Sequence, residues 1–144
     1  MVDVSAKSES MRMARARGSI RMTKDAFEAI RSQQLAKGDV LSVARIAGIM
    51  AAKRTADLIP LRHPLVLDEV QIDLAADPSL PGVRVESQVR SMGRTGVEME
   101  ALMAVTVALV TVYDMAKSVD RSMTIVDISL VEKTGGKGGR YLAG

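Results

Sequence analysis

The chain has 144 residues, of which 47% are hydrophobic, so it suits a single domain with its own core, here residues 1–144. It has no cysteine and one histidine, which excludes a disulfide framework, a thiol nucleophile and an ordinary zinc site. The start Met-Val-Asp-Val-Ser has no basic and then apolar run, so we expect no signal peptide and a cytoplasmic location.

The net charge of +3 is unevenly distributed along the chain. Residues 1–62 carry 12 Lys and Arg against 6 Asp and Glu, whereas the remaining residues carry 8 against 11. The basic first half suggests an anionic partner, either a phosphorylated small molecule or a nucleic acid. Only Phe27, Tyr113 and Tyr141 are aromatic, which argues against stacking on unpaired bases.

The first part of the chain predicts a polar arm followed by a short strand and a helix. Residues 1–18 contain three arginines without a convincing apolar partner face, so we expect an arm that is ordered only by a neighbour. Residues 19–22 suit a short strand. Thr23 is a suitable N-cap for a helix that carries Phe27 and Ile30 on one side, and Lys37-Gly38 ends it.

A second helix and a stiff loop follow. Asp39 is a natural N-cap for a helix from Val40 to about Ala56, whose apolar face consists of small residues that permit close packing. Pro60 and Pro64 forbid a regular helix between them. They therefore predict an extended loop that presents His63.

The second half predicts a hairpin, a buried helix and a last strand. Residues 70–74 and 83–89 alternate apolar and polar side chains, as the strands of a half-buried hairpin do. Residues 95–117 form a long apolar segment, and its 13 uncharged residues, 101–113, are too few to span a membrane, which takes about 20. Residues 125–130 suggest a final strand, and residues 133–144 a flexible tail rich in glycine and lysine.

The predicted element order is therefore β-α-α-β-β-α-β. Without the extra helix after the first, this is the ferredoxin-like plan, an α+β fold with an antiparallel sheet and helices on one face. The alternating strands leave the other sheet face to be covered by a helix or by a partner subunit.

Four motifs spread over the chain resemble the MoaC family, the cyclic pyranopterin monophosphate synthases of molybdenum cofactor biosynthesis. They are A-K-R-T-A-D-L-I-P-L-R-H-P-L from Ala52, G-V-E-M-E-A-L from Gly96, V-Y-D-M-A-K from Val112 and E-K-T-G-G-K-G-G from Glu132. The opening M-V-D-V-S-A-K and the K-G-D-V from Lys37 match as well. The resemblance thus covers nearly the whole chain.

The resemblance implies a ferredoxin-like lyase that acts on a small-molecule triphosphate. Such an enzyme converts 3′,8-cyclo-7,8-dihydroguanosine 5′-triphosphate to cyclic pyranopterin monophosphate and releases pyrophosphate. The resemblance also implies a hexamer, a trimer of dimers, with active sites where subunits meet. We also expect no nucleic-acid partner, no membrane, no metal site in the protein and no required cofactor, although a divalent cation can accompany the triphosphate.

Carried over residue by residue, the resemblance implies two groups of site residues. Catalytic roles fall to Lys37, Asp114 and Lys117. Substrate contacts fall to Leu61, Arg62, His63, Glu98, Met99, Glu100, Lys133 and Lys137, with Glu100 suited to the N–H edge of a guanine-like base. We expect Lys37, Lys133 and Lys137 to neutralise the triphosphate.

Most of these residues also have a plain structural interpretation. Asp114 and Lys117 are spaced as an ordinary helical ion pair, and burial of either group would shift its pKa towards neutral pH. Thr95 and Glu98 have the spacing of a capping box. A lone histidine is more often a packed or surface residue than a catalyst, and the tail is also compatible with a solvated basic segment. The tail is no P-loop, because Gly138 stands where such a loop needs Ser or Thr.

The chain departs from the family pattern at three places. Arg62 and Ala116 stand where cysteines are usual or frequent, and the L-T-H stretch with which members commonly begin is missing. Arg62 adds bulk and charge beside His63. A non-catalytic paralogue with a blocked pocket therefore stays an alternative, as does a basic nucleic-acid-binding module, whose affinity would fall steeply with salt. An assay of pyrophosphate release from the cyclised triphosphate distinguishes the enzyme from the non-catalytic paralogue and from the nucleic-acid-binding module.

Overall fold

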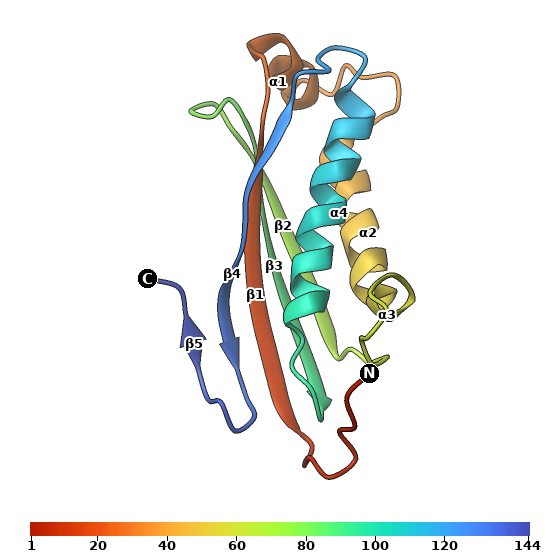
Figure 1. Cartoon of the computed structure of the whole chain (residues 1–144). Coiled ribbons are helices and arrows are strands. Elements are labelled where there is room, and N and C mark those ends of the chain that lie inside the picture. The colour runs from red at the N-terminus through yellow and green to blue at the C-terminus, as the bar shows by residue number, and fades with distance from the viewer.

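The computed structural model describes all 144 residues as one antiparallel sheet with helices on one of its faces (Figure 1). In chain order the elements are β1 (Ser10–Arg21), α1 (Lys24–Arg31), α2 (Val40–Lys53), α3 (Thr55–Leu58), β2 (Glu69–Asp77), β3 (Gly82–Gly93), α4 (Glu98–Ala116), β4 (Thr124–Thr134) and β5 (Tyr141–Leu142). The predicted order is confirmed, with the short α3 and β5 added.

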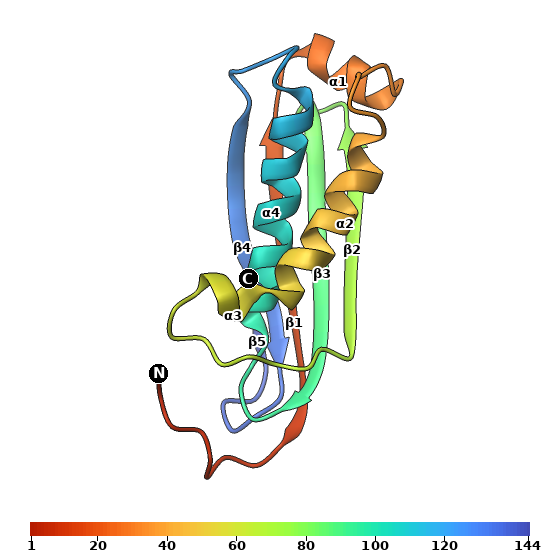
Figure 2. The same cartoon turned by 90° about the vertical axis from the view of Figure 1, so that its right-hand side faces the viewer.

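The sheet has the strand order β2-β3-β1-β4-β5, and every neighbouring pair is antiparallel. Without β5, this is the order of the ferredoxin-like fold, so the predicted α+β class is confirmed. α2 and α4 lie side by side on one face of the sheet, and no element of the chain covers the other face (Figures 1 and 2). The predicted cover for that face stays a prediction.

The predicted polar arm is wrong for residues 10–18, which form most of the central strand β1. β1 pairs with β3 without a break from Ser10 to Arg21, and with β4 on its other side. Ala14 and Ala16 are fully buried beneath the helices, whereas Arg17 is exposed on the open face. The alternation of arginine with alanine is thus a strand pattern whose buried residues are too small to look like an apolar face.

The start of the buried helix also differs from the prediction. α4 begins at Glu98 with Val97 as N-cap, and no side chain caps it. Thr95 is buried, and its hydroxyl has no hydrogen-bond partner, so the predicted capping box is wrong. The carboxylate of Glu98, the other member of the box, lies instead 3.5 Å from the Lys133 ammonium group of β4, which is a tertiary contact.

α4 owes its apolar sequence to its position in the core. With 19 residues and a mean hydropathy of 1.5 in its most apolar window, it is long and apolar enough to cross a membrane. Half of that window is buried inside the chain, against α2 and the strands β1 and β3. Core packing therefore accounts for its composition.

The predicted close packing of the second helix is confirmed at Gly48. A Cβ atom at this position would lie 2.8 Å from the Ala104 carbonyl oxygen of α4 and 2.5 Å from Cδ1 of Ile72 in β2. Only a glycine therefore lets α2 lie this close to both elements. The predicted N-caps Thr23 and Asp39 are confirmed as well, each accepting a backbone N–H of its helix.

We expect Gly48→Val to destabilise the protein by about 2–3 kcal/mol, because the added atoms overpack the junction of two helices and a strand. Thermal unfolding followed by circular dichroism measures the effect. Gly138→Ala is the matched control, since nothing lies within 4 Å of a Cβ there. Equal midpoints for the two variants would show that α2 can move away from α4 at little cost.

The glycine-rich tail is partly built into the sheet. Lys133 and Thr134 belong to β4, and the chain then returns so that Tyr141 and Leu142 pair with Lys133 and Glu132. The prediction of a tail from residue 133 therefore sets its beginning too early. β4 carries Lys133 next to the beginning of α4, where the side chain is held near Glu98.

Candidate functional site

The three residues with predicted catalytic roles meet at the carboxyl end of α4. Asp114 forms ion pairs of 3.0 Å with both Lys37 and Lys117, and Lys37 also donates to the Asp114 carbonyl. Lys37 comes from the loop before α2. Asp114 therefore pairs with two ammonium groups and not only with Lys117, the partner expected on its own helix. We call Lys37, Asp114 and Lys117 the carboxyl-end cluster.

The carboxyl-end cluster is half exposed in the single chain rather than buried. The side chains of Lys37, Asp114 and Lys117 are 51%, 54% and 45% exposed. Hydrogen bonds from Lys37 and then Lys117 hold the pKa of Asp114 below its ordinary value of 3.8. Asp114 is therefore an anion at neutral pH that orients two proton-bearing groups, and it is not itself a proton donor there.

This arrangement predicts how the contribution of Asp114 to stability depends on pH. Because its folded-state pKa is depressed, the contribution is present above pH 3.8 and disappears as the pH falls through the folded-state value. We expect Asp114→Asn to be slightly less stable than the wild type at pH 7, with a difference that shrinks as the pH falls below 3.8 and the Asp114 carboxylate takes up its proton. Urea unfolding of both proteins between pH 2 and pH 7 measures it, and a difference independent of pH would contradict it.

A second group of predicted residues lies at the other end of α4. Here a pocket of about 940 Å³ opens between the N-terminal segment, the start of α4 and the tail. Its lining includes one carboxylate, Glu98, and four basic side chains, Lys7, Arg12, Lys133 and Lys137. We call this the amino-end pocket. Its charge and the positive end of α4 both favour an anion.

Lys7 and Arg12 were not among the predicted site residues. Arg12 is only 5% exposed and donates to the carbonyls of Gly93 and Arg94, but it forms no ion pair with any carboxylate. A buried guanidinium without a carboxylate partner is unusual and suits an anionic ligand. Arg12 precedes Ala14 and Ala16 at the same two-residue spacing, so it lies on the same face of the strand. This spacing was the signal in the sequence for its burial.

The glycines of the tail make room for this arginine. Gly136 has a positive φ of 75°, and a Cβ atom there would collide with the Arg12 guanidinium. The sequence Gly135-Gly136 therefore lets the tail pass over Arg12 while Lys137 lines the same pocket. The structure thus brings Lys133 and Lys137 to one pocket and adds Arg12 to them. Lys37, the third lysine expected to neutralise the triphosphate, lies instead beside Asp114 at the other end of α4 in the same chain.

Glu98 is the acidic side chain of this pocket. Its Oε2 lies 3.5 Å from Nζ of Lys133, whereas its Oε1 is buried and has no hydrogen-bond donor. A buried carboxylate oxygen without a donor is costly, and the accessible part of this side chain, not Oε1, is what the pocket offers to a ligand. Met99, the next residue along the helix, is half-buried.

The loop with the predicted substrate contacts packs against the same helix end. Arg62 donates to both carboxylate oxygens of Glu100, at 2.7 and 3.0 Å, and to the carbonyl of Gly96. His63 is half-buried and lies near Asp3 of the N-terminal segment, whose pKa is lowered mainly by hydrogen bonds from Ser5. Leu61 is 71% exposed. The loop is thus adjacent to the amino-end pocket, but its residues do not line it.

The two groups of site residues are far apart within one chain. Glu98 and Asp114 are separated by 16 residues of α4, which corresponds to about 24 Å along the helix. The two ends of α4 also lie at opposite ends of the sheet (Figure 2). One subunit therefore does not bring all the predicted residues to one ligand.

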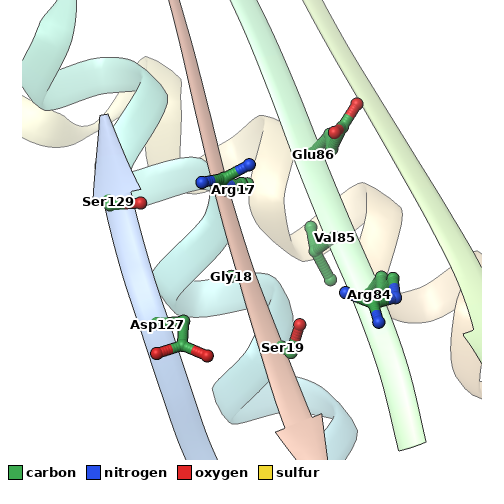
Figure 3. Close-up of a pocket in the computed structure, with 8 residues that line it drawn as sticks. All are labelled: Arg17, Gly18, Ser19, Arg84, Val85, Glu86, Asp127 and Ser129. Atoms are coloured by element: carbon green, nitrogen blue, oxygen red, sulfur yellow. The ribbon is translucent and has the colours of Figure 1, made fainter. Parts of the chain in front are cut away.

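Another hollow lies on the bare face of the sheet and contains none of the predicted residues. Figure 3 shows its lining on three strands, with Asp127 on β4, Arg17 on β1, and Arg84 and Glu86 on β3. It holds about 490 Å³, roughly half the volume of the amino-end pocket. Since charges of both signs line it, it offers no selective site for an anion. The chain also has no group of three or more His, Asp or Glu side chains placed to hold a metal ion.

Comparisons with known proteins agree with the motifs. The model of the MoaC family matches residues 1–136. The chain is 57% identical over 142 residues to the cyclic pyranopterin monophosphate synthase of Heliobacterium modesticaldum, an alignment that covers 99% of this chain and 89% of the relative. It is 55% identical over 143 residues to the protein of the same name from Dinoroseobacter shibae, covering 99% and 90%.

Proposed function

Because this chain belongs to the MoaC family, we propose that it is a lyase that forms cyclic pyranopterin monophosphate in molybdenum cofactor biosynthesis. Its substrate is 3′,8-cyclo-7,8-dihydroguanosine 5′-triphosphate, and pyrophosphate leaves. The observation that carries the proposal is the pairing of a basic pocket with an exposed lysine-aspartate-lysine cluster.

The amino-end pocket binds the triphosphate in this scheme. Its volume lies within the range of about 300–1,000 Å³ that is usual for small-molecule sites. Four basic side chains against one carboxylate neutralise several phosphate charges. One of the four, Arg12, has a planar guanidinium that can donate two hydrogen bonds to one phosphate.

The carboxyl-end cluster supplies the proton transfers. Opening and reclosing the purine and ribose rings moves several protons, and an ammonium group can donate one and take it back. Asp114 holds Lys37 and Lys117 within 3.0 Å of its two oxygens, which fixes where these groups are presented. A site covered by a second subunit would exclude water from them and strengthen their interactions with the substrate.

The active site is shared between subunits. A single nucleotide-derived triphosphate does not contact both ends of α4 in one chain, since about 24 Å separates them. A site in which the carboxyl-end cluster of one subunit faces the amino-end pocket of another brings both together. This arrangement suits a closed symmetric oligomer, here a cytoplasmic homohexamer built as a trimer of dimers.

The direct test is pyrophosphate release when purified protein is mixed with the cyclised triphosphate. We expect turnover by the wild type and essentially none by Lys37→Ala, which removes one ammonium group without touching the core. No pyrophosphate from a folded, oligomeric wild type would favour a non-catalytic paralogue. Light scattering that reports a monomer at micromolar concentration would contradict the shared site.

A further inference from the structure

We infer that Arg62 is a positioning residue: it makes Glu100 an internal anchor of α4 and leaves Glu98 as the carboxylate that faces the ligand. The inference rests on the proposed function for its catalytic consequence, but the arrangement itself is open to tests that need no turnover. It differs from the expectation that Glu100 contacts the substrate.

The first step is the geometry of the Arg62–Glu100 pair. The guanidinium donates from Nε and Nη2 to the two carboxylate oxygens, at 3.0 and 2.7 Å. This is the bidentate ion pair that the planar guanidinium of arginine forms and a lysine ammonium does not. The Arg62 side chain is 14% exposed and that of Glu100 is 3% exposed. Both oxygens of Glu100 are thus covered and already accept charge-assisted hydrogen bonds, so little capacity is left for a ligand.

The second step is the contact of the same guanidinium with the turn before α4. Nη2 of Arg62 also donates to the carbonyl of Gly96, two residues before Glu98. The carboxyl group of Glu98 folds back over Gly96, at the place where a Cβ atom would stand. By holding Gly96, Arg62 therefore fixes the turn on which the Glu98 side chain rests.

The third step compares the surroundings of the two glutamates. Glu98 lines the amino-end pocket, its side chain is 32% exposed, and one of its oxygens lacks a donor. Glu100 does not line that pocket and instead borders a separate hollow of only about 80 Å³ beside α3 and Pro64. The Glu98 side chain is therefore partly open to the pocket, whereas the Glu100 carboxylate is satisfied within the protein.

The matched test replaces each glutamate by glutamine. We expect Glu98→Gln to lower kcat at least tenfold with a nearly unchanged unfolding midpoint, because Glu98 has only one ion pair, at 3.5 Å. Glu100→Gln should show the opposite pattern, with kcat and KM within about threefold and a midpoint lowered by roughly 10 °C, because the buried guanidinium loses its counter-charge. A Glu100→Gln variant that keeps its midpoint but loses turnover would overturn the inference.

Arg62→Lys tests positioning as distinct from plain stabilisation. A lysine ammonium can pair with Glu100 but lacks the planar fork that holds Glu100 and Gly96 together. We therefore expect most of the unfolding midpoint to be retained while kcat stays about tenfold low. If Arg62→Lys instead has both the midpoint and the kcat of the wild type, Arg62 acts on stability alone.

Carboxylate labelling of the wild type tests the arrangement without any reaction. A water-soluble carbodiimide and an amine should modify Glu98 readily and leave Glu100 unmodified, as peptide mass mapping can show. Labelling of Glu100 as strong as that of Glu98 would overturn the inference. If the labelling and midpoint results hold but the wild type does not turn over the cyclised triphosphate, the proposed function fails and the anchor stands.

Discussion

Mixed oligomers of Lys117→Ala and Lys133→Ala chains are expected to release pyrophosphate, although each variant alone is nearly inactive. The two lysines lie near opposite ends of α4, so an interface between the two variants combines an intact carboxyl-end cluster with an intact amino-end pocket. With equal amounts and random assembly, about a quarter of the sites are intact, which sets the expected rate relative to the wild type. The measurement is steady-state release after the chains are unfolded together and refolded.

A mixture of Lys37→Ala and Lys117→Ala is the matched control. Both lysines belong to the carboxyl-end cluster, so every site in this mixture lacks one of them and no activity should return. An inactive Lys117→Ala and Lys133→Ala mixture, with subunit mixing proved by mass spectrometry, would contradict a site shared between subunits. Equal recovery in both mixtures would show that refolding and not complementation restores the activity.

Asp114→Asn is expected to slow the chemical step by about 10² to 10⁴, the usual range for losing general acid–base function. The variant keeps the shape of the side chain but loses the charge that holds Lys37 and Lys117 in place. Substrate affinity should change much less, since in the proposed scheme the phosphates are bound by the separate amino-end pocket. Single-turnover pyrophosphate release together with equilibrium binding measures both quantities.

Glu28→Gln provides the control for this variant. Glu28 and Arg31 also form an exposed ion pair three residues apart on a helix, at 2.7 Å, but they lie on α1 outside the site. We expect no change in rate or affinity from this substitution, because exposed pairs of this kind contribute little. If Asp114→Asn behaves like Glu28→Gln, the carboxyl-end cluster is a surface ion pair and the chemistry takes place elsewhere.

Local sequence signals were sufficient wherever a structure is decided within a few residues. Thr23 and Asp39 cap their helices through backbone N–H groups three residues away, and the alternating residues of β2 and β3 form the predicted hairpin. The charge-poor stretch after Glu100 forms the buried helix. Such patterns depend on periodicity and on short-range hydrogen bonds, which the sequence displays directly.

The sequence misled where the partner of a residue lies far along the chain. β1 is buried through Ala14 and Ala16, whose size matters only because α4 presses against them, so nothing local distinguishes that strand from a polar arm. The Thr95 capping box does not form, and the Glu98 carboxylate lies instead near Lys133, more than 30 residues later in the chain. Local preferences are weak, so tertiary contacts override them.

The amino-acid sequence by itself determined the family, the ferredoxin-like order of elements and the residue types of the site, because these depend on motifs and periodicity. Only the tertiary structure decided how those residues are grouped. Folding brings Lys37 to Asp114 across 77 positions of sequence and Arg62 to Glu100 across 38, and the rigid length of α4 keeps the two groups apart. Packing sets such distances, which is why the structure and not the sequence shows that the two groups lie about 24 Å apart in one chain.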